Sequence, residues 1–275
     1  MLTDLETKII YGIKDITSHA KATGKPADLY NRLTLFFKKL GKEHALDQIL
    51  RSTESSELSK KLLEELNAEG SKKIIKVGNT INAMGLDKPE HAEAKKIVSD
   101  TLGKYTIRHY TSSNPLDWAE KKVKSNLTLA AKNILEGKPL LEQRTTSGHT
   151  NFTDWCHIGN IGDTFYSLFF DGKPATGITP NFISNATCYI EWTLEKFEDC
   201  WASPDWLSGI YEPAFSGNCK DVIIASLLNA NPKPVQRNAI IKEIVAPSRI
   251  LKNYTNYEIK KHGSLTFTPD QVHSC

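Results

Sequence analysis

Residues 105–112 of this 275-residue chain are YTIRHYTS, and the composition and hydrophobic patterning of the sequence change at this point. β-Branched and aromatic residues alternate here with polar ones, which is the pattern of a half-buried strand. Short apolar runs broken by glycine, proline and asparagine continue the pattern along the rest of the chain. We predict strands at Tyr105–Tyr110, Thr164–Phe170, Thr187–Trp192, Ala239–Val245, Ile250–Tyr254 and Leu265–Phe267.

The residues before this run have a different composition. All tryptophans and cysteines lie beyond residue 110, whereas the first hundred residues are rich in Leu, Ile, Lys, Glu and Ala, which favour helices. Apolar residues recur there at helical spacing, as in Leu29, Leu33, Phe36, Phe37 and Leu40. Residues 1–103 are therefore predicted to form a helical bundle, and residues 104–275 a second domain.

The second domain is predicted to contain one amphipathic helix, Pro115–Leu135, directly after the first strand. The remainder is mostly β, and this order of elements favours an α+β fold over a parallel, doubly wound sheet. We expect a mixed or antiparallel β-sheet core with flanking helices.

The balance of charge excludes some classes of function. The chain has 35 Lys+Arg against 32 Asp+Glu, a net charge of +3, so it does not hold nucleic acid through a field of basic residues. No apolar stretch reaches the roughly 18 residues of a membrane span. The N-terminal MLTDLETKIIYGIKDITSHAK has no apolar core or cleavage site, so we expect no cleavable signal peptide.

The five cysteines do not form a recognisable disulfide framework, because their number is odd and none lie close together. We expect them to be buried free thiols. His149, Cys156 and His157 are near one another, but no fourth ligand has a usable spacing. We therefore predict no metal site.

Three segments of the second domain carry groups that can do chemistry. Arg108 and His109 are neighbours on the first predicted strand, and because strand residues alternate, only one of them can face a given cleft. The stretch from residue 145 to 166 is dense in hydroxyls, amides, glycines and aromatics, as ligand-binding loops are. Its candidates are Ser147, His149, Phe152, Phe165 and Tyr166.

The third segment is IIKEIVAPSRIL, residues 240–251, which places Glu243 inside an apolar strand. Glutamate is disfavoured inside an apolar strand unless its face of the strand is exposed to water or has a function. Each segment also has a structural explanation: a surface ion pair for Arg108, a turn-rich loop, and a solvent-facing Glu243.

In this order the three segments resemble the mono-ADP-ribosyltransferase toxin and effector family. That family has Arg or His on the first core strand, a Ser/Thr-containing strand or loop, and a late strand on which Glu is followed by apolar residues and Pro. The corresponding runs here are RHYTS at 108–112, TTS at 145–147 and EIVAP at 243–247, and the resemblance covers about residues 104–268. Ile241 stands where arginine-modifying members carry Glu or Gln. The resemblance therefore points to branches that modify other targets, such as threonine on ubiquitin, or that make cyclised arginine adducts.

The resemblance implies NAD as the cofactor and a role for each candidate. Glu243 would accept a hydrogen bond from the ribose 2′-hydroxyl and stabilise an oxocarbenium-like transition state. Arg108 would bind the pyrophosphate through paired hydrogen bonds. His109, if it is the inward neighbour instead, would bond the adenosine ribose.

The same resemblance assigns the loop residues and the biological setting. Phe152, Phe165 or Tyr166 would stack on nicotinamide, and Ser147 or His149 would orient the ribose or the target nucleophile. The chain would be an effector made in the bacterial cytoplasm and secreted into a host cell, where it modifies a host protein. The helical residues 1–103 would recognise that target or a secretion chaperone.

Two alternatives rest on other residues. Cys156, with His262 and a distant Asn or Asp, fits a cysteine protease or deamidase. A non-catalytic module that binds a host protein would instead use the tryptophan-rich stretch Trp192–Trp206 as an interface patch.

Overall fold

The computed structural model describes residues 74–76, 101–125, 128–129, 163–177, 179–197, 199–204, 214–229, 251 and 256–275, and eight isolated positions among the first hundred. These residues belong to two compact units. The second unit takes its described residues from Lys73–Lys121, Phe165–Lys261 and Phe267–Cys275, and the site described below lies wholly within it. The predicted helical bundle falls almost entirely outside the described residues, and the predicted boundary at 103/104 stays a prediction.

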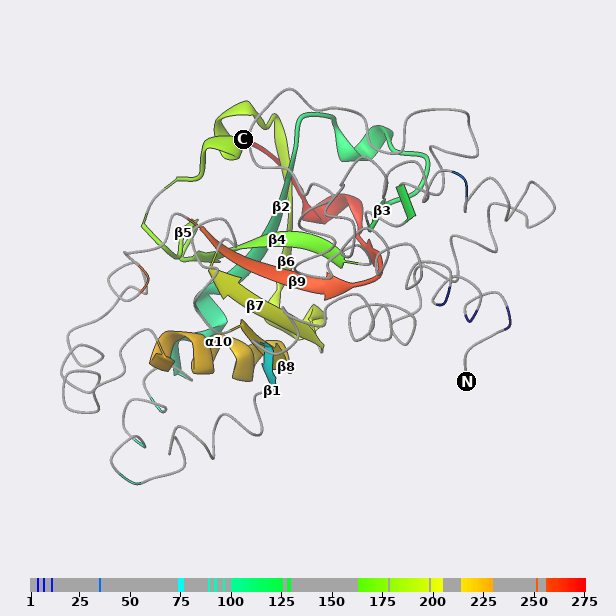
Figure 1. Ribbon diagram of the computed structural model, residues 1–275. Helices are drawn as coiled ribbons and strands as arrows, with labels where there is room; N and C mark the ends of the chain where they lie inside the picture. Colours follow the sequence, from blue (N-terminus) through cyan, green and yellow to red (C-terminus); the bar gives the residue numbers. More distant parts are fainter. Residues whose placement is uncertain are drawn as a thin grey trace. The chain divides into compact units, whose positions relative to one another are not determined.

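Nine of the described strands form one mixed sheet, in the order β1-β8-β7-β9-β4-β2-β6-β11, with β5 added beside β4 (Figure 1). β2 pairs antiparallel with β4 and β6, β7 with β8 and β9, β11 with β6, and β5 with β4, whereas β1 and β8 are parallel. The strands are β1 (Ile74–Lys76), β2 (Tyr105–Thr111), β4 (Asp163–Phe170), β5 (Lys173–Pro174), β6 (Cys188–Thr193), β7 (Cys200–Pro204), β8 (Ala214–Gly217), β9 (Tyr257–His262) and β11 (Val272–Ser274). A separate pair joins β3 (Lys122–Val123) to β10 (Leu265–Thr266).

One longer helix, α10 (Cys219–Asn229), accompanies the sheet in the described part of the chain. It begins where the Asn218 side chain accepts a hydrogen bond from the Lys220 amide, and it packs on β7 and β8. The short 3₁₀ turns are η3 (Leu102–Lys104), η4 (Pro115–Asp117), η5 (Asn181–Asn185), η6 (Leu194–Lys196) and η8 (Pro269–Gln271). The described residues therefore combine helix and a mainly antiparallel sheet, which fits the α+β class.

Several predicted strands are confirmed. The strands predicted at 105–110, 164–170 and 187–192 correspond to β2, β4 and β6 within one residue at each end, and the last predicted strand contains β10. β4 continues into β5 through a two-residue turn in which Asp171 and Gly172 both have positive φ, as an Asp-Gly hairpin requires. The strand predicted at 239–245 lies outside the described residues. Leu251, the described residue of the strand predicted at 250–254, is not in a strand.

The helix predicted at Pro115–Leu135 is wrong over its first ten residues. Only η4 forms at Pro115, and the chain turns extended at Trp118 and then enters β3. The Lys121 ammonium donates to the carbonyl of Trp118 at 2.8 Å and also to that of Leu116, so it occupies acceptors that a continuing helix would use. The next described helical residues follow Ser125, whose side-chain oxygen accepts from the Thr128 amide.

Part of the core lies on one face of β2, β4 and β6. Ile107, Leu168 and Ile190 are buried there, and the rings of Tyr166, Trp192 and Phe197 meet edge to face. Trp192 and Trp201 are 2% and 0% exposed. The hypothesis of a tryptophan interface patch is therefore wrong for these two residues, because they are core side chains.

The four described cysteines are free thiols, as predicted. Cys200 and Cys219 are also buried, where a hydrogen bond with Cys219 together with burial raises the pKa of the Cys200 thiol. Cys188 is half-buried and Cys275 is exposed, so the prediction of burial fails for Cys275. Within the described residues no helix has the length and hydrophobicity needed to cross a bilayer.

Candidate functional site

Strand β2 presents different chemistry on its two faces. Arg108 is paired across the sheet with Glu191 of β6 and with Ser167 of β4, and alternation puts Thr106 and Tyr110 on this same face. His109 points to the opposite face, where the core lies. We call the group of Thr106, Arg108, Tyr110 and Glu191 the arginine cluster.

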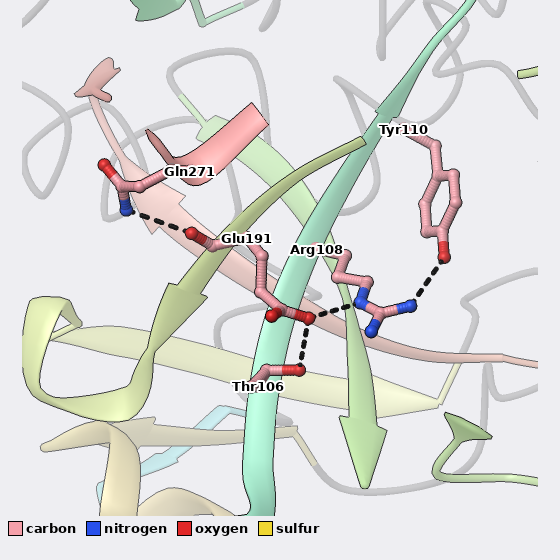
Figure 2. Close-up of polar contacts among 5 residues, drawn as sticks. All are labelled: Thr106, Arg108, Tyr110, Glu191 and Gln271. Atoms are coloured by element: carbon pink, nitrogen blue, oxygen red, sulfur yellow. Dashed lines mark hydrogen bonds and ion pairs between the residues drawn. The ribbon is translucent and has the colours of Figure 1, made fainter. Parts of the chain in front are cut away.

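Arg108 is held by hydrogen bonds and by contacts with two aromatic rings. Its Nε donates to Oε2 of Glu191 at 2.5 Å, and its Nη1 donates to the hydroxyl of Tyr110 at 3.3 Å (Figure 2). The guanidinium carbon lies 4.3 Å from the ring centres of both Phe169 and Tyr189. A charge-assisted hydrogen bond and two cation–π contacts together leave this side chain one orientation.

Glu191 is itself fixed from two directions. Its Oε2 accepts a second hydrogen bond from the Thr106 hydroxyl at 3.0 Å, and its backbone carbonyl accepts one from the Gln271 side chain at 3.0 Å. Gln271 ends η8, in which Thr268 and Gln271 form a capping box. The carboxylate that orients Arg108 is therefore part of a rigid section of the sheet.

The electrostatics of the arginine cluster keep Arg108 charged. Burial acts to lower the pKa of Arg108, but the hydrogen bonds to Tyr110 and Glu191 and the charge of Glu191 outweigh it and raise that pKa. Burial raises the pKa of Tyr110, against the opposing effect of Arg108. A permanent cation and a neutral phenol therefore lie side by side.

Ser167 lies opposite Arg108 on β4, on the same face, and is 5% exposed. Phe165 is two residues before Ser167 on β4, so it lies on the same face, and it is half-buried. Sequence reasoning missed Ser167, although it is the one aliphatic hydroxyl inside the largely aromatic run FYSLFF of residues 165–170, and that isolation was the available signal.

The next strand beyond β4 is β9, and its face can be assigned from shared neighbours. Lys261 and Tyr166 both lie against the ring of Phe197, so they occupy the core face. Alternation along β9 then places Glu258 and Lys260 on the face of Arg108 and Ser167. A cation, a hydroxyl and a carboxylate thus come from three neighbouring strands, β2, β4 and β9.

Glu258 and Lys260 form an ion pair, with Nζ to Oε2 at 2.9 Å. The carboxylate side chain is 21% exposed, whereas the lysine side chain is 1% exposed. Lys260 is the strand partner of Trp201, and its Nζ lies 4.4 Å from the centre of the Trp201 ring. Sequence reasoning missed both residues, because the alternation in YEIKKH covers only four residues and three of the six residues are charged.

His109 and Tyr166 belong to the opposite face. His109 Nδ1 is 2.9 Å from the carbonyl oxygen of Phe165, which can only accept, so this nitrogen carries the proton. The rings of His109 and Tyr166 meet edge to face at 5.8 Å. The structure therefore separates the sequence-derived NAD-binding candidates: Arg108 and Phe165 share one face, and His109 and Tyr166 share the other.

The remaining candidates lie outside the described residues. They are Glu243, His149, Ser147 and Phe152, and the alternative nucleophile Cys156 lies there too. His262, its suggested partner, is the last residue of β9. In the described part of the chain, no group of three or more His, Cys, Asp or Glu side chains could hold a metal ion.

Comparison with protein-family models finds none that matches the chain, and comparison with curated proteins finds no similar sequence. The interpretation of the site therefore depends on the residues and their geometry.

Proposed function

We propose that the chain transfers ADP-ribose from NAD to a protein side chain. The observation that carries the proposal is the placement of Arg108, Ser167 and Glu258 on one face of three neighbouring strands. The same three residue types, in the same chain order, make up the pattern of the ADP-ribosyltransferase family that the sequence resembles. In this proposal Ser167 takes the place that the sequence assigned to Ser147.

The residues of this face suit NAD. A guanidinium has five N–H donors, and the two bonds of Arg108 use Nε and Nη1, so donors remain for a pyrophosphate. Neighbouring strands lie about 4.8 Å apart, which puts the strands of Arg108 and Glu258 about 10 Å apart. A ligand that extends from a pyrophosphate to a ribose can therefore contact both Arg108 and Glu258. Phe165 offers an aromatic ring on the same face.

The reaction breaks the bond between C1′ of the ribose and the nicotinamide nitrogen, and nicotinamide leaves with the electron pair. A nucleophile on the acceptor protein forms the new bond to C1′ and loses a proton. Positive charge grows on the ribose as the bond breaks, and a carboxylate held nearby stabilises that charge. Glu258 is the described carboxylate that fits this role, and Glu243 is the one that the sequence motif suggests.

The other elements of the proposal concern the partner. A host protein supplies the acceptor side chain, with ubiquitin threonine among the chemistries that the sequence resemblance suggests. Residues 1–103 recognise that target or a secretion chaperone.

Labelled NAD incubated with the full chain and a host-cell lysate tests the proposal. We expect the wild type to label a protein, and Arg108→Lys and Glu258→Gln to lose most of that labelling. Glu195→Gln is the matched control, because Glu195 pairs with Lys220 on the surface and is 64% exposed, and it should label normally.

The carboxylate is identified by comparing Glu258→Gln with Glu243→Gln. Loss with Glu258→Gln alone assigns Glu258, and loss with Glu243→Gln alone returns the role to Glu243. Failure of the wild type to label any protein, with or without added purified ubiquitin, would overturn the proposed function.

A further inference from the structure

Lys260 is an unusual occupant of the interior. Among the described residues, the largest fully buried side chains are Trp192, Trp201, Phe197, Phe215 and Lys260, so a lysine side chain is as fully buried as four large aromatic ones. Taking an ammonium out of water costs several kcal/mol unless it is paired. A buried pair is, moreover, often no more stable than an apolar side chain of the same size. Stability alone therefore does not explain a lysine at this position.

The contacts of Lys260 fix the position of its ammonium group. The backbone of residue 260 is paired with Trp201 in the sheet, and the Trp201 ring lies beside Nζ at 4.4 Å. From this position Nζ bonds Oε2 of Glu258 at 2.9 Å. Because a carboxylate has two oxygens, this bond holds the group while Oε1 can still accept a hydrogen bond from a ligand.

We propose that Lys260 is a positioning residue, which fixes the carboxylate of Glu258 on the face that also carries Arg108 and Ser167. This inference rests on the proposed function, since it concerns how Glu258 performs its role. Because Glu258 is partly exposed, its carboxylate can contact the ligand. Because Lys260 is completely buried, it cannot contact the ligand and acts only through Glu258.

Lys260→Met tests the proposal, because methionine is an unbranched side chain of nearly the same length and carries no charge. We expect kcat for transfer to fall about 100-fold, as for other small misplacements of a reacting group. KM for NAD should change little, since Arg108 remains in place. The Tm should stay within about 3 °C of the wild type or rise, because the buried charge is gone.

Lys261→Met is the matched control. Lys261 is the neighbouring lysine on β9, but it faces the core side, where its Nζ lies near the Asp199 carbonyl and the Phe197 ring. We expect this variant to keep the wild-type kcat. Equal losses of kcat in the two variants would overturn the proposal, because the effect would then not depend on Glu258.

A double variant tests whether Lys260 acts through Glu258. If it does, Lys260→Met combined with Glu258→Gln should be no less active than Glu258→Gln alone. Multiplicative losses, or a large fall in Tm with unchanged kcat in Lys260→Met, would show a structural role and overturn the inference while the wild type still transfers ADP-ribose. A wild type with no transfer activity would overturn the proposed function and this inference with it.

Discussion

The ion pair of Arg108 and Glu191 gives the sharpest prediction about stability. Glu191→Ala leaves the Arg108 guanidinium in contact with the rings of Phe169 and Tyr189 but without its carboxylate. Removing one partner of a fully buried pair costs about 3–5 kcal/mol, and removing one partner of an exposed pair costs about 0–1 kcal/mol. The two side chains are 12% and 26% exposed, so this pair lies nearer the buried limit. We expect Glu191→Ala to lower the free energy of unfolding by about 2 kcal/mol.

Urea unfolding followed by tryptophan fluorescence measures this loss, since Trp192 and Trp201 are buried in the same sheet. Glu195→Ala is the control, and it should change the free energy of unfolding by less than about 1 kcal/mol because its pair with Lys220 is exposed. If Glu191→Ala costs no more than this control, the arginine cluster does not hold the sheet as we describe.

Three further predictions concern single groups. Tyr110→Phe removes one long hydrogen bond to Arg108, and it should lower the free energy of unfolding by about 1 kcal/mol or less in the same urea assay. The hydrogen bond from Lys220 lowers the pKa of Glu195 to about 2. A lowered pKa gives stability that is present above the unfolded value and is lost as pH falls through the folded one. Lys220→Met should therefore reduce Tm slightly at pH 6 and less at pH 2, and an equal effect at both would contradict the ion pair. In the native protein, iodoacetamide followed by peptide mapping should modify Cys275 well before Cys200, because Cys275 is exposed and Cys200 is buried; equal rates would contradict the burial of Cys200.

The strands that carry apolar alternation were predictable from sequence, and those with mixed composition were not. β2, β4 and β6 contain aromatic and β-branched residues in quantity, so their propensity and their environment agree. β9 has three charged residues in six, and its membership of the sheet depends on the pairing of Lys260 with Glu258 and Trp201. Such tertiary compensation leaves no local pattern in the sequence.

The early end of the helix predicted from Pro115 was also not predictable from sequence. Asn114 and Pro115 are good helix-starting residues, and they do start η4. The termination depends on the Lys121 side chain reaching back to the Trp118 carbonyl and on β3 finding β10 as a partner. Neither interaction follows from helix propensity.

The candidate site was predictable in part. Arg108 was found from its place on the first strand, but its partner Glu191 lies 83 residues away, and only the strand pairing brings them together. The question of whether Arg108 or His109 shares a face with other polar groups is answered by the register of β2, which a sequence pattern does not contain.

In the proposed function, this chain transfers ADP-ribose with a carboxylate on the face of Arg108 and Ser167. Intact-mass spectrometry of a purified acceptor protein, incubated with NAD and the full chain, tests it most directly. We predict a mass increase of one ADP-ribosyl group with the wild type and none with Glu258→Gln, while Glu195→Gln behaves as the wild type. An unmodified acceptor in every case, or equal modification by the wild type and Glu258→Gln, would contradict the claim.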